Sequence, residues 1–472
     1  MKLKRILGLV LAIMMAMSLL AACGGNDDAA PVDAGDEEVV DDGGDAADPP
    51  ADDDEDDVIV AEVEGEATLL TFWTFGDSHA DYFVEAQNKW NAQNPDRQVQ
   101  LEISVQPFSQ MHENLQMALE TGEGAPDLVD VEVGRAEMFL NVPHVPFVPQ
   151  NDVLAEFMPY LIYSRLEPWM AHGNYYGVCY HVGSVLMFYN IGLFEEAELD
   201  WNDIVTWDDF IEMGQLMVER TGMPMIQVEG ANIWSFSAMV AQQHSDYVID
   251  GQPNLDSEEA IRALTLKHDF IYVYEIGRPM VGLQIDSEEF YAEIATNNFA
   301  SFIAPAWYMG RYLAHAQNQS GNIAVAPMPV FEAGNNRSSS AGGTMTAVTN
   351  QVAPENEQLA LEFVAFAKAS YEMAILQWTL LGFDPVRWDV LDSPELREPS
   401  PALEFFGDHV FDVLRDIADE TGAVRFSAAN AFIVRDYINV NILPNVIVEP
   451  LVDPRTALVE GQAELEADPR FN

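Results

Sequence analysis

Polar side chains directly follow two of the predicted strands, where an open sheet binds its ligands. Asp77 and Ser78 come after the apolar run 68–75, and Glu132 comes after the apolar run 128–131. Because parallel strands end at one edge of a sheet, carboxylate and hydroxyl groups there can hydrogen-bond a polar ligand. Two alternatives stay open. Ser78 could cap the next helix with Asp77 at its positive end, and Glu132 could be a solvated loop acid.

The N-terminus suggests a different chemistry. A basic start and a short apolar stretch lead to the residues Leu-Ala-Ala-Cys-Gly at 20–24, a layout typical of a secretory signal. Small residues before a cysteine also resemble the bacterial lipobox. We therefore expect a lipoprotein signal peptide over 1–22 and acyl chains on Cys23, which would hold the chain at the extracytoplasmic face of the cell membrane. An ordinary signal peptide is the alternative.

Charge excludes one class of partner. The 472 residues include 21 Lys and Arg against 78 Asp and Glu, a net charge of −57, so nucleic-acid binding is excluded. About half of the residues over 26–57 are acidic, and we assign 23–66 to a disordered tether after the lipid. The run Asp52–Asp57 lacks the glycine and the ligand spacing of a calcium loop, so a plain spacer is favoured.

Cysteine usage excludes a disulfide framework. The chain has two cysteines, Cys23 and Cys179, and lipid on the first would leave the second without a partner. Cys179 lies between Val178 and Tyr180, and we expect it to be a small buried apolar residue and not a catalytic thiol.

Strands and helices alternate after the tether. The predicted strands cover 68–75, 99–105 and 128–131, and the predicted helices begin at Ser78 and near Met111. The first run is almost continuously apolar, so Trp73 within it is expected in the core. Strand, helix, strand, helix and strand in this order predict a parallel sheet covered on both faces.

A second set of elements begins near Gly183. Strand patterns occur over 185–189, 299–303 and 345–348, and helical patterns start at 206 and 354 or span 256–276 and 287–297. We expect an α/β protein of two lobes joined by several crossings. The expected parts are lobe 1 over 67–182, lobe 2 over 183–341, a return to lobe 1 with a hinge over 342–386, and a C-terminal helical part over 387–472 that packs mainly on lobe 2.

Segments spread over nearly the whole globular part resemble one family. They are 70–73, 90–95, 122–129, 176–177, 188–190, 193–197, 206–210, 326–329 and 342–343. In this order and spacing the chain resembles the extracellular solute-binding proteins of ABC importers, and among them the sugar-binding group that includes the maltodextrin-binding proteins.

This resemblance implies a periplasmic-binding-protein-like clamshell that closes on a ligand about a hinge. The implied ligand is a carbohydrate, and the implied partners are the permease subunits in the membrane. The resemblance implies no cofactor, metal or catalytic residue. We expect a monomer that contacts the membrane only through the lipid on Cys23, because a tether keeps the captured solute close to the permease.

The resemblance also suggests ligand contacts, because sugars need aromatic platforms and paired polar groups. In lobe 1 it favours Asp77, Ser78 and Glu132, described above. The contacts expected elsewhere are His181, Gly183 and Ser184 at the first crossing, Asn232, Trp234, Trp307 and Tyr308 in lobe 2, Gly343 at the second crossing, and Trp378 and Arg387 at the third. Simple burial is the alternative for the tryptophans, hinge backbone for Gly183, and loop packing for Trp378 and Arg387.

One departure leaves the ligand open. Many of these sugar-binding proteins carry Lys beside the first aspartate, and this chain has Ser78 there. No phosphate-binding loop, dinucleotide fingerprint, His-Glu-x-x-His or Gly-x-Ser-x-Gly motif occurs, so we do not expect an enzyme. An exported glycan-active enzyme and a ligand sensor for a membrane receptor remain as alternatives, because 78 acidic residues could place two carboxylates together.

Overall fold

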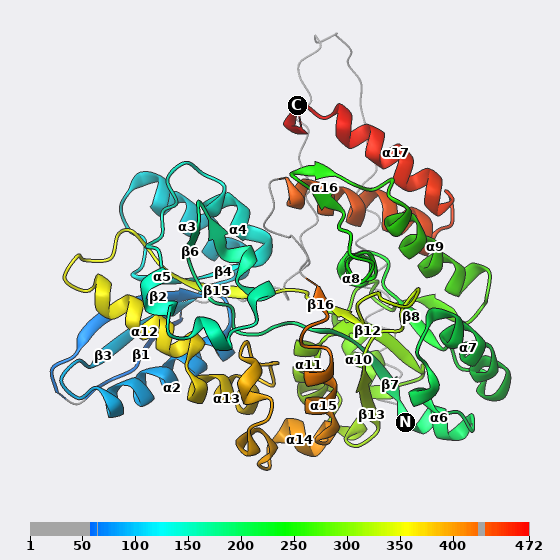
Figure 1. Ribbon diagram of the computed structural model, residues 1–472, viewed down its shortest axis with the longest axis horizontal. Helices are drawn as coiled ribbons and strands as arrows, with labels where there is room; N and C mark the ends of the chain where they lie inside the picture. Colours follow the sequence, from blue (N-terminus) through cyan, green and yellow to red (C-terminus); the bar gives the residue numbers. More distant parts are fainter. Residues whose placement is uncertain (1–56, 64, 423–429, 472) are drawn as a thin grey trace, which may run out of the picture. The chain divides into compact units, whose positions relative to one another are not determined.

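The computed structural model describes residues 57–63, 65–422 and 430–471 (Figure 1). The expected signal peptide, Cys23 and most of the expected tether lie outside the described residues.

Five strands form the first sheet, in the order β1, β3, β2, β4, β15. Their bounds are β1 (Asp57–Val60), β2 (Thr68–Thr74), β3 (Val99–Val105), β4 (Leu128–Glu132) and β15 (Thr344–Val348). β2 is parallel to β3 and β4, as predicted, whereas β1 and β15 are antiparallel to their neighbours. β1 corrects the expected tether, because Val58–Val60 pair with β3 and extend the sheet.

Helices cover both faces of this sheet (Figure 1). α2 (Asp77–Gln93) and α12 (Glu357–Ala369) pack on one face, and α3 (Phe108–Thr121) and α4 (Val133–Leu140) lie on the other. The expected N-cap at Ser78 is wrong, because α2 begins one residue earlier and its N-cap, Gly76, makes no side-chain bond. Burial alternates along β2. Leu70 and Phe72 are buried on the α2 face, but Trp73 on the other face is only partly buried, so Trp73 is not the fully buried residue that we expected.

A second sheet is built around β7 (Val185–Asn190), with β12 (Ser301–Pro305) and β13 (Ile323–Ala326) antiparallel on either side. β8 (Ile226–Val228) and β11 (Gly277–Pro279) form a separate parallel pair. α7 (Trp207–Thr221) begins where the sequence predicted a helix, with a capping box in which the side chains of Thr206 and Asp209 each accept from the backbone N–H of the other. The other helices in this part are α6 (Ile191–Glu196), α8 (Trp234–Ala241), α9 (Glu258–Tyr272), α10 (Glu288–Thr296) and α11 (Met309–His315).

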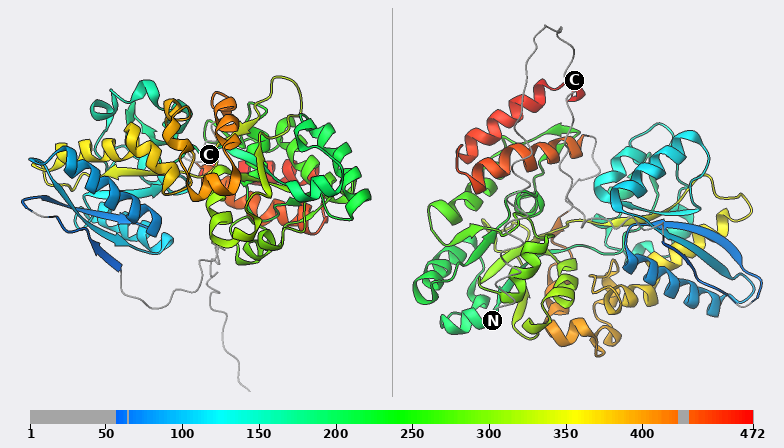
Figure 2. Two further views of the ribbon diagram at one scale, coloured as in Figure 1. Left: turned by 90° about the horizontal axis from the view of Figure 1, so that it is seen from below. Right: turned by 180° about the vertical axis from the view of Figure 1, so that it is seen from behind.

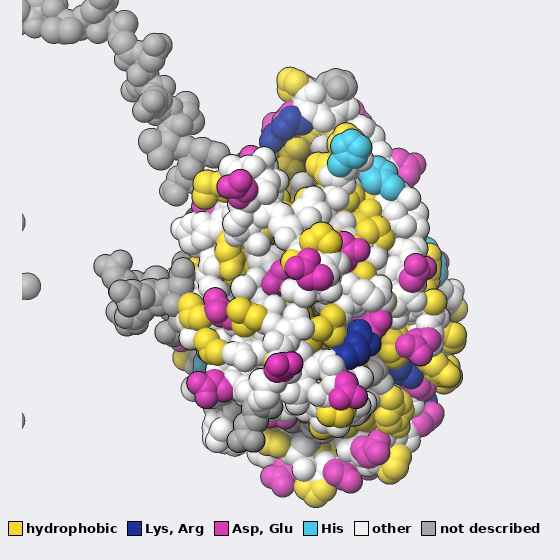
Figure 3. Space-filling view, turned by 90° about the vertical axis from the view of Figure 1, so that its left-hand side faces the viewer, with side chains coloured by type: hydrophobic (Ala, Val, Ile, Leu, Met, Phe, Trp, Pro, Cys, Tyr) yellow, Lys and Arg dark blue, Asp and Glu magenta, His cyan; other side chains and the backbone are white. Residues whose placement is uncertain are grey.

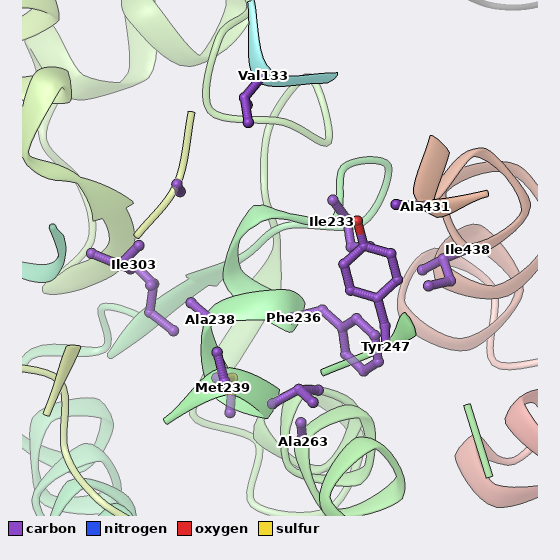
Figure 4. Packing of buried hydrophobic residues seen from close by; sticks show 14 of the residues in the cluster. Val133, Ile233, Phe236, Ala238, Met239, Tyr247, Ala263, Ile303, Ala431 and Ile438 are labelled. Carbon is purple, nitrogen blue, oxygen red and sulfur yellow. The ribbon is translucent and has the colours of Figure 1, made fainter. Parts of the chain in front are cut away.

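The C-terminal part is helical. α14 (Pro401–Phe406) and α15 (His409–Asp416) contact β13, and α17 (Pro454–Ala467) packs on α9, as two views agree (Figures 1 and 2). α16 (Ala431–Tyr437) continues into π-helical turns over Ile438–Ile442 and Pro444–Val448. Within the described residues this run, Ala431–Val448, is the one helix long and apolar enough to cross a membrane. Ala431 and Ile438 nevertheless belong to a buried cluster with Phe236 and Tyr247 (Figure 4).

Three chain crossings between the sheets lie side by side. Cys179 pairs with Met345 and Ser184 with Ser340, which joins the first crossing to the second. The N–H of Val182 donates to the carbonyl of Asp384 at 3.0 Å, which joins the first to the third. Cys179 is fully buried and its thiol donates to the His181 carbonyl at 3.0 Å, which confirms it as a small buried residue.

The remaining elements are short. They are α5 (Asn151–Leu154), α13 (Tyr371–Thr379), β5 (Met170–Ala171), β6 (Asn174–Tyr175), β9 (Val248–Ile249), β10 (Gln252–Pro253), β14 (Ser338–Ser339) and β16 (Thr421–Gly422).

Candidate functional site

The carboxyl edge of the first sheet places three of the predicted residues together. Asp77 and Ser78 open α2 after β2 and are exposed, and Glu132 ends the adjacent parallel strand β4. Glu132 also caps α4, because its Oε2 accepts from the N–H of Gly134 at 2.6 Å. Burial raises the pKa of Glu132, and the charge of Arg435 from α16 acts in the opposite direction. Part of its acceptor capacity is therefore already used by its own helix.

A buried carboxylate beneath this edge organises several elements. Asp130 on β4 accepts hydrogen bonds from Thr74 Oγ1 at 2.7 Å, Thr346 Oγ1 at 2.6 Å and Tyr180 O–H at 3.0 Å, and it faces His79 Nδ1 at 2.9 Å. Burial alone would raise the pKa of Asp130. Hydrogen bonds from His79 and Thr346 and the charge of Lys368 outweigh burial, so the pKa lies below its usual value.

Lys368 from α12 completes this network from the other side. Its Nζ donates to Thr346 Oγ1 at 3.2 Å and lies over the Tyr180 ring. Burial lowers the pKa of Lys368 to about 7, against the attraction of the Asp130 charge. The network thus joins β2, α2, β4, the first crossing, β15 and α12 through one carboxylate.

A second group of residues gathers at the second crossing. We call it the hinge cluster, and it consists of Gly342, Gly343, Arg165, Trp169, His181 and Trp307. A Cβ built on Gly342 would lie 3.2 Å from Trp307 Nε1 and 3.7 Å from His181 Cε1. The Trp307 N–H donates to the Ala341 carbonyl at 3.3 Å, and Arg165 Nη2 donates to the Gly342 carbonyl at 2.6 Å. The structure therefore brings the predicted residues His181, Trp307 and Gly343 together.

Several buried polar atoms in the hinge cluster lack a partner among the described residues. They are Arg165 Nε, Trp169 Nε1 and His181 Nδ1. A Cβ on Gly343 would lie 3.5 Å from the Trp169 ring and would clash with Arg165 Nη2. Burial and then the charge of Arg165 lower the pKa of His181 well below its usual value, so the ring is neutral. A buried polar atom without a hydrogen-bond partner costs folding free energy. The presence of several such atoms in one cluster favours a polar ligand that would bond them.

The first crossing is held by a carboxylate from the third. Asp384 accepts from the N–H groups of Gly183 at 3.0 Å and Ser184 at 2.8 Å. Burial raises the pKa of Asp384 to about 6, against these two bonds. Gly183 has φ +69°, and a Cβ there would clash with the Ala341 carbonyl, so only glycine fits this close approach. The contacts of Gly183 and Ser184 described here are with the hinge itself.

Three of the expected ligand contacts are corrected. Tyr308 is fully buried and its O–H donates to the Ile285 carbonyl at 2.8 Å, so it is a core residue. Trp378 is also fully buried and packs edge-on against Phe411 at 4.7 Å. Arg387 is buried in an ion pair with Asp389 at 2.7 Å. Packing and pairing occupy these side chains.

Asn232 and Trp234 stand at the start of α8. Asn232 Oδ1 accepts from the N–H of Ile233 at 2.7 Å, and Trp234 is partly buried against two core clusters. Both remain predicted ligand contacts. Sequence reasoning missed His79, Asp130, Arg165 and Trp169. His79 could have been identified from its position next to Ser78 after the first strand. Arg165 and Trp169 lie in short 3₁₀ turns, which have no periodic sequence pattern.

The comparisons with known proteins place this geometry in a family. The model of the bacterial extracellular solute-binding protein family matches residues 76–370. The chain belongs to this family. It is 40% identical over 413 residues to the arabinooligosaccharide-binding protein of Halalkalibacterium halodurans, covering 87% of this chain and 92% of that one. It is 36% identical over 402 residues to the arabinooligosaccharide-binding protein of Bacillus subtilis, covering 84% and 92%.

Solved structures agree on the fold of this solute-binding protein. The cyclic α-maltosyl-1,6-maltose-binding protein of Arthrobacter globiformis superimposes with a TM-score of 0.70 at 17% identity, covering 85% of this chain and 99% of that one. This superposition shows the fold alone, and it confirms the predicted fold class of an α/β binding protein. In the residues described, no group of three or more His, Cys, Asp or Glu side chains is placed to hold a metal ion.

Proposed function

We propose that the protein is the substrate-binding component of an ABC importer and that its ligand is an oligosaccharide of arabinose. The observation that carries this proposal is the 40% identity, over 92% of its length, to a relative named for that ligand. A neutral ligand also suits a chain of net charge −57, and the face in Figure 3 carries many acidic and few basic side chains.

The hinge cluster supports binding of a sugar in physical terms. Trp307 is partly buried, and its ring can lie against the apolar face of a sugar while Arg311 sits 5.7 Å from its centroid. The unpaired donors of Arg165 and Trp169 lie at the second crossing and are buried in this conformation, so we propose that they bond sugar hydroxyls only after the lobes move. We propose that Asp77, Ser78 and Glu132 contribute from the first sheet, and Asn232 and Trp234 from the start of α8, when the protein closes on its ligand.

Calorimetry on the chain that begins at Gly24 tests this function. A size series of arabinooligosaccharides is expected to bind, and a matched series of maltooligosaccharides is the control. If binding heat is measured only with the maltooligosaccharides, the ligand belongs to another sugar class.

The same mixtures are then analysed by chromatography, because we propose binding without turnover. Release of shorter sugars would contradict this and favour the glycan-active enzyme.

The Trp307→Ala variant is expected to weaken sugar binding by roughly 1–3 kcal/mol, the cost of losing a well-packed aromatic contact. Because the ring is only partly buried, the free energy of unfolding without ligand is expected to change less than for a core tryptophan. Calorimetry and urea unfolding on the same preparation measure both quantities. Full affinity with a large loss of stability would identify Trp307 as a packing residue.

We also propose that acyl chains on Cys23 hold the protein at the extracytoplasmic face of the membrane, as a monomer beside the permease subunits. Two or more chains exceed the threshold for stable anchoring. Expressed in a bacterium that processes lipoproteins, the wild-type chain is expected in the membrane fraction. Cys23→Ser is expected to be released or left unprocessed. Identical fractionation and mass for both chains would rule out lipid at Cys23.

A further inference from the structure

His79 stands where the carboxyl edge of the first sheet meets the hinge cluster. It lies in the first turn of α2, directly after Asp77 and Ser78. Tyr180, which stacks on the His79 ring, is followed in the chain by His181 of the hinge cluster. A ligand that contacts both the sheet edge and the hinge cluster would pass beside His79.

The ring of His79 is held in one orientation. Tyr180 stacks on it with centroids 4.0 Å apart and an interplanar angle of 20°, and Phe75 meets it edge-on at 5.6 Å. Its Nδ1 lies 2.9 Å from Asp130 Oδ2. Because a carboxylate accepts and does not donate, the network assigns the proton of the neutral ring to Nδ1. A carboxylate behind a histidine fixes its tautomer and orientation in this way.

The other nitrogen, Nε2, is open to a ligand. The described residues make hydrogen bonds to Nδ1 of this ring and none to Nε2. The residue is 8% exposed, so part of its side chain can meet a ligand. Nδ1 is occupied by Asp130, and Nε2 is the ring nitrogen that remains for a ligand.

We propose that Nε2 of His79 accepts a hydrogen bond from a hydroxyl of the bound oligosaccharide, and that Asp130 positions the ring for this contact. The proposal rests on the proposed function and adds a recognition residue to it. Asp130 already accepts from Thr74, Thr346 and Tyr180, so His79 is not needed to satisfy it. The contact would also couple the ligand to the first crossing, because Tyr180 both stacks on His79 and bonds Asp130.

Two amide substitutions separate the two nitrogens of the ring. The amide of asparagine reaches the place of Nδ1, and that of glutamine reaches the place of Nε2. His79→Asn keeps the bond to Asp130 and loses the ligand contact, so it is expected to unfold like the wild type and to bind arabinooligosaccharide about tenfold more weakly. His79→Gln keeps an acceptor for the ligand and loses the bond to Asp130, so it is expected to be less stable with affinity close to that of the wild type.

The same two substitutions at His144, an exposed loop residue, are the matched control and are expected to change neither property. Wild-type affinity in His79→Asn, or equal losses of affinity in both His79 variants, would overturn the proposal while leaving the proposed function intact. If the wild type itself binds no neutral oligosaccharide, the proposed function and this contact both fail.

A measurement without ligand tests the tautomer independently. Nitrogen NMR of the uniformly labelled full chain is expected to show the proton of the neutral His79 ring on Nδ1 and none on Nε2. A proton on Nε2 of the neutral ring would overturn its role as an acceptor.

Discussion

Replacement of Asp130 by alanine is expected to lower the free energy of unfolding by about 3–5 kcal/mol, because several buried hydrogen-bond donors and a buried lysine lose the carboxylate that satisfies them. The carboxylate is completely buried and holds Thr74, Tyr180 and Thr346. Its loss leaves these hydroxyls and the buried Lys368 ammonium without their acceptor or counter-charge. Urea unfolding of wild type and variant at neutral pH measures the difference.

The double variant Asp130→Ala with Lys368→Met is the control for this reasoning. Lys368 is fully buried, so removing its charge together with the carboxylate removes the uncompensated ion. The double variant is therefore expected to recover part of the stability that the single variant loses. Asp127→Ala is a second control, since that carboxylate accepts from the Thr71 backbone at 2.9 Å in a less buried setting. A loss below about 1 kcal/mol for Asp130→Ala would mean that the network does not carry this part of the fold.

The core of the first sheet could be predicted because its signal is local. The strands over 68–74 and 99–105 and the helix between them follow from apolar periodicity alone. The antiparallel edges could not be predicted in this way. β1 begins inside an acidic segment, and β15 joins the sheet through pairing with β4, more than 200 residues earlier in the chain. Pairing over such distances leaves no local pattern.

The candidate site shows the same limit at the level of single residues. His181, Trp307 and Gly343 could be predicted from the family resemblance, which carries order and spacing along the chain. The role of His79 depends on Asp130, 51 residues away, and on Tyr180, which comes later still. Only the folded chain brings these three residues together.

Residue type also failed to separate buried aromatics from accessible ones. Trp307 and Tyr308 are adjacent, yet Trp307 reaches the hinge cluster and Tyr308 is fully buried, because successive side chains after β12 point in different directions. Trp378 on α13 is a predicted ligand contact because the family resemblance places it at the third crossing. Its position in the core follows from contacts with α15, which the local sequence does not reveal.

Trp378→Ala is accordingly expected to lower the free energy of unfolding by about 3–5 kcal/mol, as for other buried aromatic residues that are cut back to alanine. The ring is fully buried, and its Nε1 has no partner in the described residues, so the loss comes from packing and not from a hydrogen bond. Urea unfolding measures it. Calorimetry at a temperature where the variant is still folded is expected to return wild-type affinity for the sugar. Trp307→Ala provides the opposite pattern, a smaller loss of stability with weaker binding. If Trp378→Ala stays as stable as the wild type but loses affinity, then Trp378 contacts the ligand after all, and its assignment to the core is wrong.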